Sequence, residues 1–336
     1  RPMRARAVIV LNRVGGLGDV AMVLAAAKAI KLLRVAAVVL VTHPRHAALA
    51  RACPYVDAVV SSPEEARGLA GDPLLGREAL PEAWAQLSSF DLNSAGFGLS
   101  AAHQVDAYLQ ALGLQAPPVL KQLHLELPDA VQARLRDLAD PRDDARRVLL
   151  HAGLGDPNRT WPAASWHALA EGLAAAGWRP CWIGSRSSDP QRGVHTLRTA
   201  GVQDLVDALE PLEVVALCRR SRLLVSTDGG PVQLAGASDI GIVGLYSVVR
   251  GTCRLPFRHA AAAWNATALE AACPRFPCYA HILDPEAVAR FEGAHGLPSA
   301  DIPTRFSRWC EVEPPYRCME CLAPERVLQA CLERLA

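Results

Sequence analysis

The chain has 336 residues, which is long enough for two domains that each bury a core of their own. Its formal net charge of +1 gives no electrostatic reason to expect a nucleic acid as a partner. Hydrophobic residues make up 51% of the chain, but the longest apolar runs are only as long as a strand, so no transmembrane segment is predicted.

Strands and helices are predicted to alternate in two series. In the first series the expected strands are 6–12, 36–44 and 56–62, and the expected helices are 19–34, 45–53 and 103–114. In the second series the expected strands are 148–152, 179–185, 222–228 and 240–247, and the expected helices are 163–178, 210–221 and 230–238. Short strands separated by helices indicate parallel sheets with right-handed crossovers. A charged, Pro-containing segment near 140–147 divides the series, so we predict an α/β protein with two doubly wound domains.

The turn after the strand at 222–228 is a candidate anion site. The stretch "STDGGPVQLAGAS" places Asp228, Gly229 and Gly230 between a strand and a helix that begins near Pro231. Pro is favoured in the first helical turn because its missing N–H would lack a partner there in any case. The free N–H groups of the turn, with that of Gln233, can bind an anion at the positive helix end. A tight turn with a capping Asp is an equally good interpretation of this stretch alone.

Two more turns of the second series carry candidate ligand groups. In "HAGLGDPNRTWP", Arg159 lies on a short loop beside the candidate anion site, where a guanidinium can grip a diphosphate. By itself this feature would favour a solvated surface Arg. In "WIGSRSSDP", the residues from Ser185 to Asp189 offer polar groups for a ribose or a base.

The first strand is followed by "RVGGLGDVAMVL", a glycine-rich turn that opens a helix. Gly16, Gly18 and Ala21 satisfy the G-x-G-x-x-[GA] pattern of dinucleotide-binding proteins. However, no acidic residue follows the second strand to hold a ribose, so the pattern is poor evidence for NAD. Asp19, in the first turn of the helix, must therefore be explained in another way. An acid that merely stabilises the helix end is one explanation.

The stretches "VGGLGDV", "CPYVDAVV", "HQVDAYLQALGL", "HAGLGDPNRTWP" and "STDGGPVQLAGAS" together resemble glycosyltransferase family 9, the ADP-heptose heptosyltransferases. The closing "RCMECLAPERVLQACLERL" is similar to the C-terminal helix of that family, and the matches keep the family's order from about residue 7 to the end. The resemblance implies a GT-B fold, in which two Rossmann-like domains face each other. We expect an acceptor-side domain at 1–144, a nucleotide-sugar domain at 145–322, and a last helix at 323–336 that packs back toward the first domain.

The resemblance also implies roles for the turn residues. Gly15, Gly16 and Gly18 would let an acceptor hydroxyl approach, and Asp19 would take its proton as it attacks the anomeric carbon. Arg159, Asp228, Gly229, Gly230 and Gln233, with Ser185 and Asp189, would form the donor site, where charge on the leaving diphosphate is stabilised. Attack opposite the leaving group inverts the anomeric centre, and an enzyme of this type needs no catalytic metal. Asp189 has only a loose match to a donor-contacting acid of some members.

The sequence departs from the family pattern at the donor turn. The family has Asp-Ser/Thr-Gly followed by His, where this chain has Asp228-Gly229-Gly230 and Gln233, and Arg159 stands where Lys is common. Gln and Arg keep hydrogen bonding and positive charge, so we expect diphosphate binding to survive. Because of these departures, the sequence does not identify the sugar or the nucleotide base of the donor.

Ten Cys, several of them in apolar runs, indicate reduced thiols in a cytoplasmic protein rather than a disulfide framework. Five of them fall in the segment 273–321. Cys278, Cys310, Cys318 and Cys321, with Cys273 as an alternate ligand, are candidates for a structural zinc or iron site. A metal-binding Cys finger occurs in the branch of the family that modifies autotransporter adhesins. Buried free thiols are the alternative to a metal site.

The sequence thus predicts an inverting glycosyltransferase that transfers heptose from ADP-heptose to a hydroxyl of a glycolipid, such as the lipopolysaccharide core, or of a protein. Two other classes stay open: a non-catalytic sugar-nucleotide-binding scaffold and an NAD(P)-linked oxidoreductase. We expect no cofactor for catalysis, a cytoplasmic location, either free or peripheral at the inner membrane, and a homo-oligomer as one option for the assembly.

Overall fold

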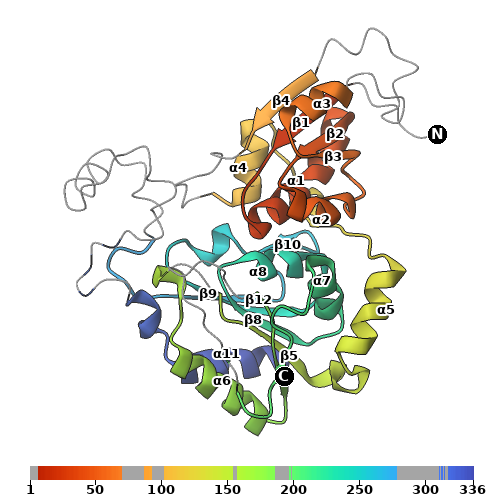
Figure 1. Ribbon diagram of the computed structural model, residues 1–336. Helices are drawn as coiled ribbons and strands as arrows, with labels where there is room; N and C mark the ends of the chain where they lie inside the picture. Colours follow the sequence, from red (N-terminus) through yellow and green to blue (C-terminus); the bar gives the residue numbers. More distant parts are fainter. Residues whose placement is uncertain are drawn as a thin grey trace.

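The computed structural model describes residues 7–69, 87–92, 102–153, 157–185, 197, 199–277, 310, 312, 314 and 317–336. Its longer strands form two parallel sheets, which lie in the upper and the lower unit of the molecule as drawn in Figure 1. This confirms the predicted α/β class with two parallel sheets. The domain boundaries at 144 and 322 stay predictions.

The first unit is a sheet of four strands with the order β3-β2-β1-β4. Its elements are β1 (Ala7–Asn12), α1 (Leu17–Arg34), β2 (Ala36–Val41), α2 (Ala47–Arg51), β3 (Ala58–Val60), α3 (Pro63–Gly68), β4 (Leu87–Asp91) and α4 (Gln104–Ala111). Ala7 of β1 pairs with Ala36 of β2, and Val8 pairs with Leu87 of β4. The carboxyl ends of these strands therefore point toward the second unit, and the glycine-rich turn that follows β1 lies at the junction of the two units (Figure 1).

Helix α1 is the central element of the first unit. Its residues from Val20 to Ala27, together with Ala29 and Ile30, are buried, which is typical of a helix covered on all sides. It contacts β2 and α4 within its own unit and α8 in the second unit. The helix begins at Leu17, two residues earlier than expected from the sequence, with Gly16 as its N-cap residue.

The chain crosses to the second unit through α5 (Asp129–Leu138) and a turn of 3-10 helix at Pro141–Arg146. Helix α5 packs against α7 of the second unit, so this part of the connection belongs with the second unit. At the end of the crossing, the buried Arg147 pairs with Asp144, and Arg220 binds the same carboxylate at 2.8 Å. Two arginines thus hold the Asp144 carboxylate next to the start of the second sheet.

The second unit is a parallel sheet of six strands with the order β12-β9-β8-β5-β6-β7. Its elements are β5 (Arg147–His151), α6 (Ala163–Ala175), β6 (Arg179–Trp182), β7 (Gln203–Asp204), α7 (Pro211–Arg219), β8 (Leu223–Thr227), α8 (Gly230–Leu234), β9 (Gly241–Tyr246), β12 (Ala266–Glu270) and α11 (Pro324–Leu335). A short antiparallel pair, β10 (Phe257–Arg258) and β11 (Ala261–Ala262), lies outside this sheet. The strand order reverses between β5 and β8, and open α/β sheets bind their ligands at such a switch point.

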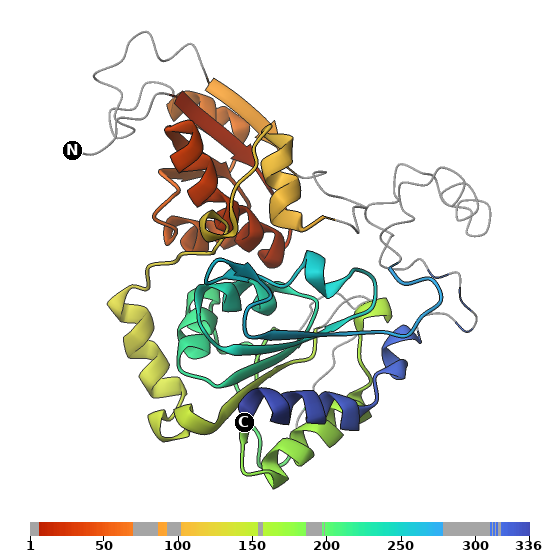
Figure 2. The ribbon, with the colours of Figure 1, turned by 180° about the vertical axis from the view of Figure 1, so that it is seen from behind.

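The position of the C-terminal helix differs from the expectation. Helix α11 packs against α6 and against β8 and β9 of the second unit, as the view from behind also shows (Figure 2). The expectation that 323–336 would pack back toward the first unit is therefore wrong for this structure. The physical reason is the stripe formed by Val327, Cys331 and Leu335, which is buried in the same hydrophobic cluster as Trp166 of α6.

In the described part of the chain, no helix combines the length and the apolar composition needed to cross a bilayer.

Candidate functional site

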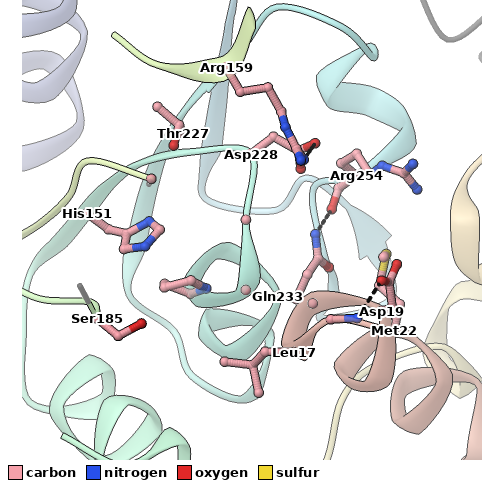
Figure 3. Close-up of a pocket in the computed structure, with 16 residues that line it drawn as sticks. Leu17, Asp19, Met22, His151, Arg159, Ser185, Thr227, Asp228, Gln233 and Arg254 are labelled. Atoms are coloured by element: carbon pink, nitrogen blue, oxygen red, sulfur yellow. Dashed lines mark hydrogen bonds and ion pairs between the residues drawn. The ribbon is translucent and has the colours of Figure 1, made fainter. Parts of the chain in front are cut away.

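A cavity of about 410 Å³ lies where the turns after β1, β5, β6 and β8 meet. Figure 3 shows its walls, which come from both units. The lining residues are Gly16, Leu17, Gly18, Asp19, Met22, His151, Gly153, Arg159, Ser185, Thr227, Asp228, Gly229, Gly230, Pro231, Gln233 and Arg254. The cavity therefore occupies the crevice that the topology of the second sheet predicts, and the first unit closes it from the other side.

Two glycine-rich turns approach each other closely across this cavity. A Cβ built on Gly18 of α1 would lie 3.4 Å from the Cα of Gly230 in α8. A Cβ on Gly230 would lie only 3.0 Å from Cδ2 of Leu17. The starts of α1 and α8 are thus in van der Waals contact, and a side chain at position 230 would have to displace Leu17 of the first unit.

Gly153 brings the ends of β5 and β8 together within the second unit. Its φ is +63°, and a Cβ at this position would lie 1.7 Å from Oγ1 of Thr227. Both the backbone conformation and the space therefore require glycine. Gly153 and Thr227 both line the cavity.

Asp19 lines the first-unit side of the cavity, and both of its oxygens have partners. Oδ2 accepts a hydrogen bond from the N–H of Gly16 at 3.0 Å, which caps the helix, and Oδ1 lies 2.8 Å from Nη2 of Arg13. Arg13 in turn donates from Nε to the hydroxyl of Tyr108 at 3.2 Å, and its side chain is 13% exposed, whereas that of Asp19 is 36% exposed. Asp19 is thus both the helix-stabilising acid and a carboxylate that solvent or an acceptor can reach.

The second-unit side of the cavity carries the guanidinium of Arg159. Its Nη1 lies 3.6 Å from Oδ2 of Asp228, across the mouth of the crevice between β5 and β8. The N-cap residue of α8 is Gly229. Since α8 has only five residues, its N-terminus presents a few free N–H groups rather than the field of a long helix. Arg159 therefore supplies one formal positive charge on this wall, and Arg254 of the same unit supplies another.

His151, at the end of β5, is an uncharged side chain of the site that can donate or accept a hydrogen bond. Ser226 donates its hydroxyl hydrogen to the carbonyl of Thr227 at 2.7 Å, so its oxygen is left to accept from Nδ1 of His151 at 2.9 Å. This assigns the proton to Nδ1 and leaves Nε2 as an acceptor. Burial lowers the pKa of His151 to about 4, so the ring is neutral at pH 7.

Gln233 and Arg254 connect the second-unit wall of the cavity to the first unit. Nε2 of Gln233 donates to the backbone carbonyl of Arg254 at 2.6 Å, and Nη1 of Arg254 donates to Oε1 of Gln104 in α4 at 2.7 Å. Gln233 thus holds a loop whose Arg254 side chain reaches across the cleft to the first unit.

The structure brings together most of the residues singled out from the sequence. Gly16, Gly18, Asp19, Arg159, Ser185, Asp228, Gly229, Gly230 and Gln233 all line the one cavity. Gly15 lies just outside the lining, in a position where a Cβ would lie 2.6 Å from Oδ2 of Asp19. Asp189 falls outside the described residues. Arg13 and Arg254 were missed, and only Arg13 carried a signal, because it precedes the glycine-rich turn.

The cysteines of 273–321 are only partly described, since Cys278 falls outside the described residues. Burial raises the pKa of the Cys318 thiol to about 11, and the neighbouring Cys273 and Cys310 add to this shift. Cys321 is exposed. Within the described residues, no three His, Cys, Asp or Glu side chains form a metal-binding group.

Two α/β units that face each other across a cleft lined by the turns of both define a protein of the GT-B class. The family model for glycosyltransferase family 9 (heptosyltransferase) matches residues 86–278, more than half of the chain, and the chain belongs to this family of glycosyltransferases. No curated protein sequence matches the chain.

Several solved structures share the fold at low sequence identity. A family 9 glycosyltransferase from Veillonella parvula DSM 2008 is 14% identical with a TM-score of 0.65, and the match covers 98% of each chain. The ADP-heptose lps heptosyltransferase II of E. coli is 14% identical with a TM-score of 0.62, again over 98% of each chain. The iron-containing dodecameric glycosyltransferase TibC from enterotoxigenic E. coli H10407 is 16% identical with a TM-score of 0.63, over 99% of this chain and 76% of TibC.

Proposed function

We propose that this glycosyltransferase transfers heptose from ADP-heptose to a hydroxyl of a glycolipid or a protein, with inversion at the anomeric carbon. The observation that carries the proposal is the placement of Asp19 and Arg159 on opposite walls of one cavity. A base on the acceptor side and a cation on the donor side are what a displacement at an anomeric carbon requires. The TibC complex with ADP-D-beta-D-heptose and the E. coli WaaC complex with ADP support the choice of donor, since both have this fold.

In the proposed reaction the acceptor oxygen forms a bond to the anomeric carbon while the bond from that carbon to the diphosphate oxygen breaks. The proton of the acceptor hydroxyl passes to the carboxylate of Asp19, and the bonding electron pair leaves with the diphosphate. Arg13 holds the carboxylate in place through Oδ1. General-base assistance of this kind contributes about 10²–10⁴ in rate.

The leaving diphosphate gains negative charge, which the second-unit wall would stabilise. Arg159 would exchange its contact with Asp228 for the phosphate oxygens, and the N–H groups at Gly229 and Gly230 would donate to them. Preorganised donors of this kind are worth most where charge develops in the transition state. No step in this scheme requires a metal ion.

The test of the donor is a thermal unfolding series with ADP, ADP-heptose, UDP-glucose and NAD⁺. A nucleotide that binds only the folded state adds about 2.7 kcal/mol of stability at 100 times its dissociation constant. We expect ADP and ADP-heptose to raise Tm and NAD⁺ to leave it unchanged. A rise with NAD⁺ alone would favour the oxidoreductase, and ADP-heptose binding without ADP release on any acceptor would favour the scaffold.

We also propose that the thiols of 273–321 hold one structural zinc or iron ion. The effect of the neighbouring Cys273 and Cys310 on the pKa of the Cys318 thiol supports this, because thiolates are ligands that suit both metals. Elemental analysis of the purified protein should find about one metal ion per chain, and chelation should lower Tm. A metal-free protein with an unchanged Tm would leave these thiols as ordinary cysteines. A homo-oligomer and a location at the inner membrane stay predictions.

A further inference from the structure

The loop that carries Arg159 has little local structure of its own. Arg159 is the last residue of a 3-10 helix of three residues, Pro157–Arg159. So short a helix contributes almost no stability by itself, because its hydrogen bonds are few and poorly aligned. The position of the Arg159 guanidinium must therefore be set by contacts with the rest of the molecule.

Those contacts converge on the carbonyl oxygen of Asn158. This oxygen accepts one hydrogen bond from Oγ of Ser247 and another from Sγ of Cys318 at 3.2 Å. Asn158 and Ser247 are almost completely buried, with exposed fractions of 4% and 1%. The two donors come from different parts of the fold: Ser247 directly follows β9, and Cys318 begins the 3-10 turn Cys318–Cys321.

This carbonyl belongs to the peptide unit that joins Asn158 to Arg159. Because a peptide unit is planar, two donors on its oxygen fix both its tilt and the direction in which the next Cα lies. On the other side of Arg159, the indole N–H of Trp161 donates to the carbonyl of Leu322 at 2.8 Å. The C-terminal segment thus holds the chain on both sides of Arg159, although neither Ser247 nor Cys318 lines the cavity.

We propose that Ser247 and Cys318 are positioning residues for donor binding, which act by holding the Asn158–Arg159 peptide so that the guanidinium meets the diphosphate. This inference rests on the proposed function, since it takes the donor to be a nucleoside diphosphate sugar. It applies to the metal-free chain, in which Cys318 keeps its proton. A Cys318 thiolate bound to a metal could not donate to Asn158, and Ser247 would then hold this carbonyl alone.

The first experiment compares Ser247→Ala with Ser238→Ala by calorimetric titration of ADP and of adenosine. Ser238 is a matched control, because it is also buried and donates to a backbone carbonyl, that of Ala235, at 2.9 Å, away from the cavity. Loss of one buried hydrogen bond should raise the Kd of ADP about 5–30-fold in Ser247→Ala. The Kd of adenosine should change less than about 2-fold, since adenosine has no diphosphate, and Ser238→Ala should leave both unchanged.

The second experiment is a double-mutant cycle with Arg159→Ala. If Ser247 acts through Arg159, Ser247→Ala should have no further effect on ADP binding once the guanidinium is gone. Additive losses would overturn the inference. Cys318→Ser keeps a hydroxyl donor and should bind ADP more tightly than Cys318→Ala, so this pair tests the same carbonyl if Ser247→Ala fails to fold.

The outcomes separate this inference from the proposed function. A wild-type chain that does not bind ADP removes the proposed donor and the inference with it. A wild-type chain that binds ADP, with Ser247→Ala weakening ADP and adenosine equally, leaves the donor in place and overturns the positioning role alone.

Discussion

Replacing Asp19 by asparagine changes the charge of the side chain with almost no change in its shape. The new amide could still accept from the N–H of Gly16 through its carbonyl oxygen, so the helix cap would survive. The ion pair to Arg13 at 2.8 Å would be lost, and the largely buried Arg13 side chain would keep its bond to Tyr108. Because the Asp19 side chain is 36% exposed, we expect a cost of about 1 kcal/mol in the free energy of unfolding.

The effect on catalysis should be much larger than the effect on stability. Loss of a general base lowers turnover by about 10²–10⁴, which corresponds to about 3–5 kcal/mol in the activation free energy. ADP affinity should stay within about 2-fold, because Asp19 belongs to the unit opposite the donor wall. The assays are ADP release at saturating donor, calorimetric titration of ADP, and urea unfolding.

Asp57→Asn is a matched control for the Asp19 variant. Asp57 also combines an ion pair, to Lys31 at 2.6 Å, with a hydrogen bond from a backbone N–H, that of Val38 at 2.8 Å, and it does not line the cavity. We expect it to lose similar stability and to retain turnover. If Asp19→Asn kept turnover within about 3-fold of the wild type, Asp19 would be a capping residue only and the proposed base would have to be sought elsewhere.

Three further changes test other parts of the structure. Arg159→Ala should weaken ADP binding more than adenosine binding, and equal losses in titration would mean that Arg159 acts on the fold or the base. Burial lowers the pKa of both His103 and His151 to about 4, so the unfolded chain, in which a His has an ordinary pKa near 6.5, binds more protons below that pH. Urea unfolding should show that each of these two histidines lowers the free energy of unfolding by about 2.5 kcal/mol between pH 7 and pH 4.5, and His103→Gln should remove about half of their combined effect. Gly230→Ala places a methyl group 3.0 Å from Leu17 and should lower both Tm and turnover, whereas Gly18→Ala, with its nearest contact at 3.4 Å, should be tolerated; equal effects of the two substitutions would contradict the close contact of α1 with α8.

The fold class was predictable because it depends on local patterns. The apolar run that became β1 and the alternation of strands with helices report which faces are buried, and parallel sheets follow from the order of the elements. The turns after β1, β5 and β8 were recognisable for the same reason, since Gly, Asp and Pro mark them in the sequence. Their convergence followed from the rule that ligands bind at the carboxyl ends of parallel strands.

The C-terminal helix shows where local pattern stops being informative. The spacing of Val327, Cys331 and Leu335 indicates that one face of α11 is buried, but it is silent about which surface buries it. The amphipathic pattern is compatible with packing on either unit. In the tertiary structure the helix packs on α6 and on the second sheet, and it covers apolar surface there.

The partners of the site residues were decided by tertiary structure alone. Tyr108 reaches Arg13 from a position 95 residues away, and Cys318 reaches Asn158 from a position 160 residues away. The sequence indicates which residues of each element are buried and where the turns lie, because both depend on residues that are close together in the chain. Which two distant groups meet depends on how the two sheets dock. That docking is stabilised by many weak contacts between residues from distant parts of the sequence, so no single stretch of the chain specifies it.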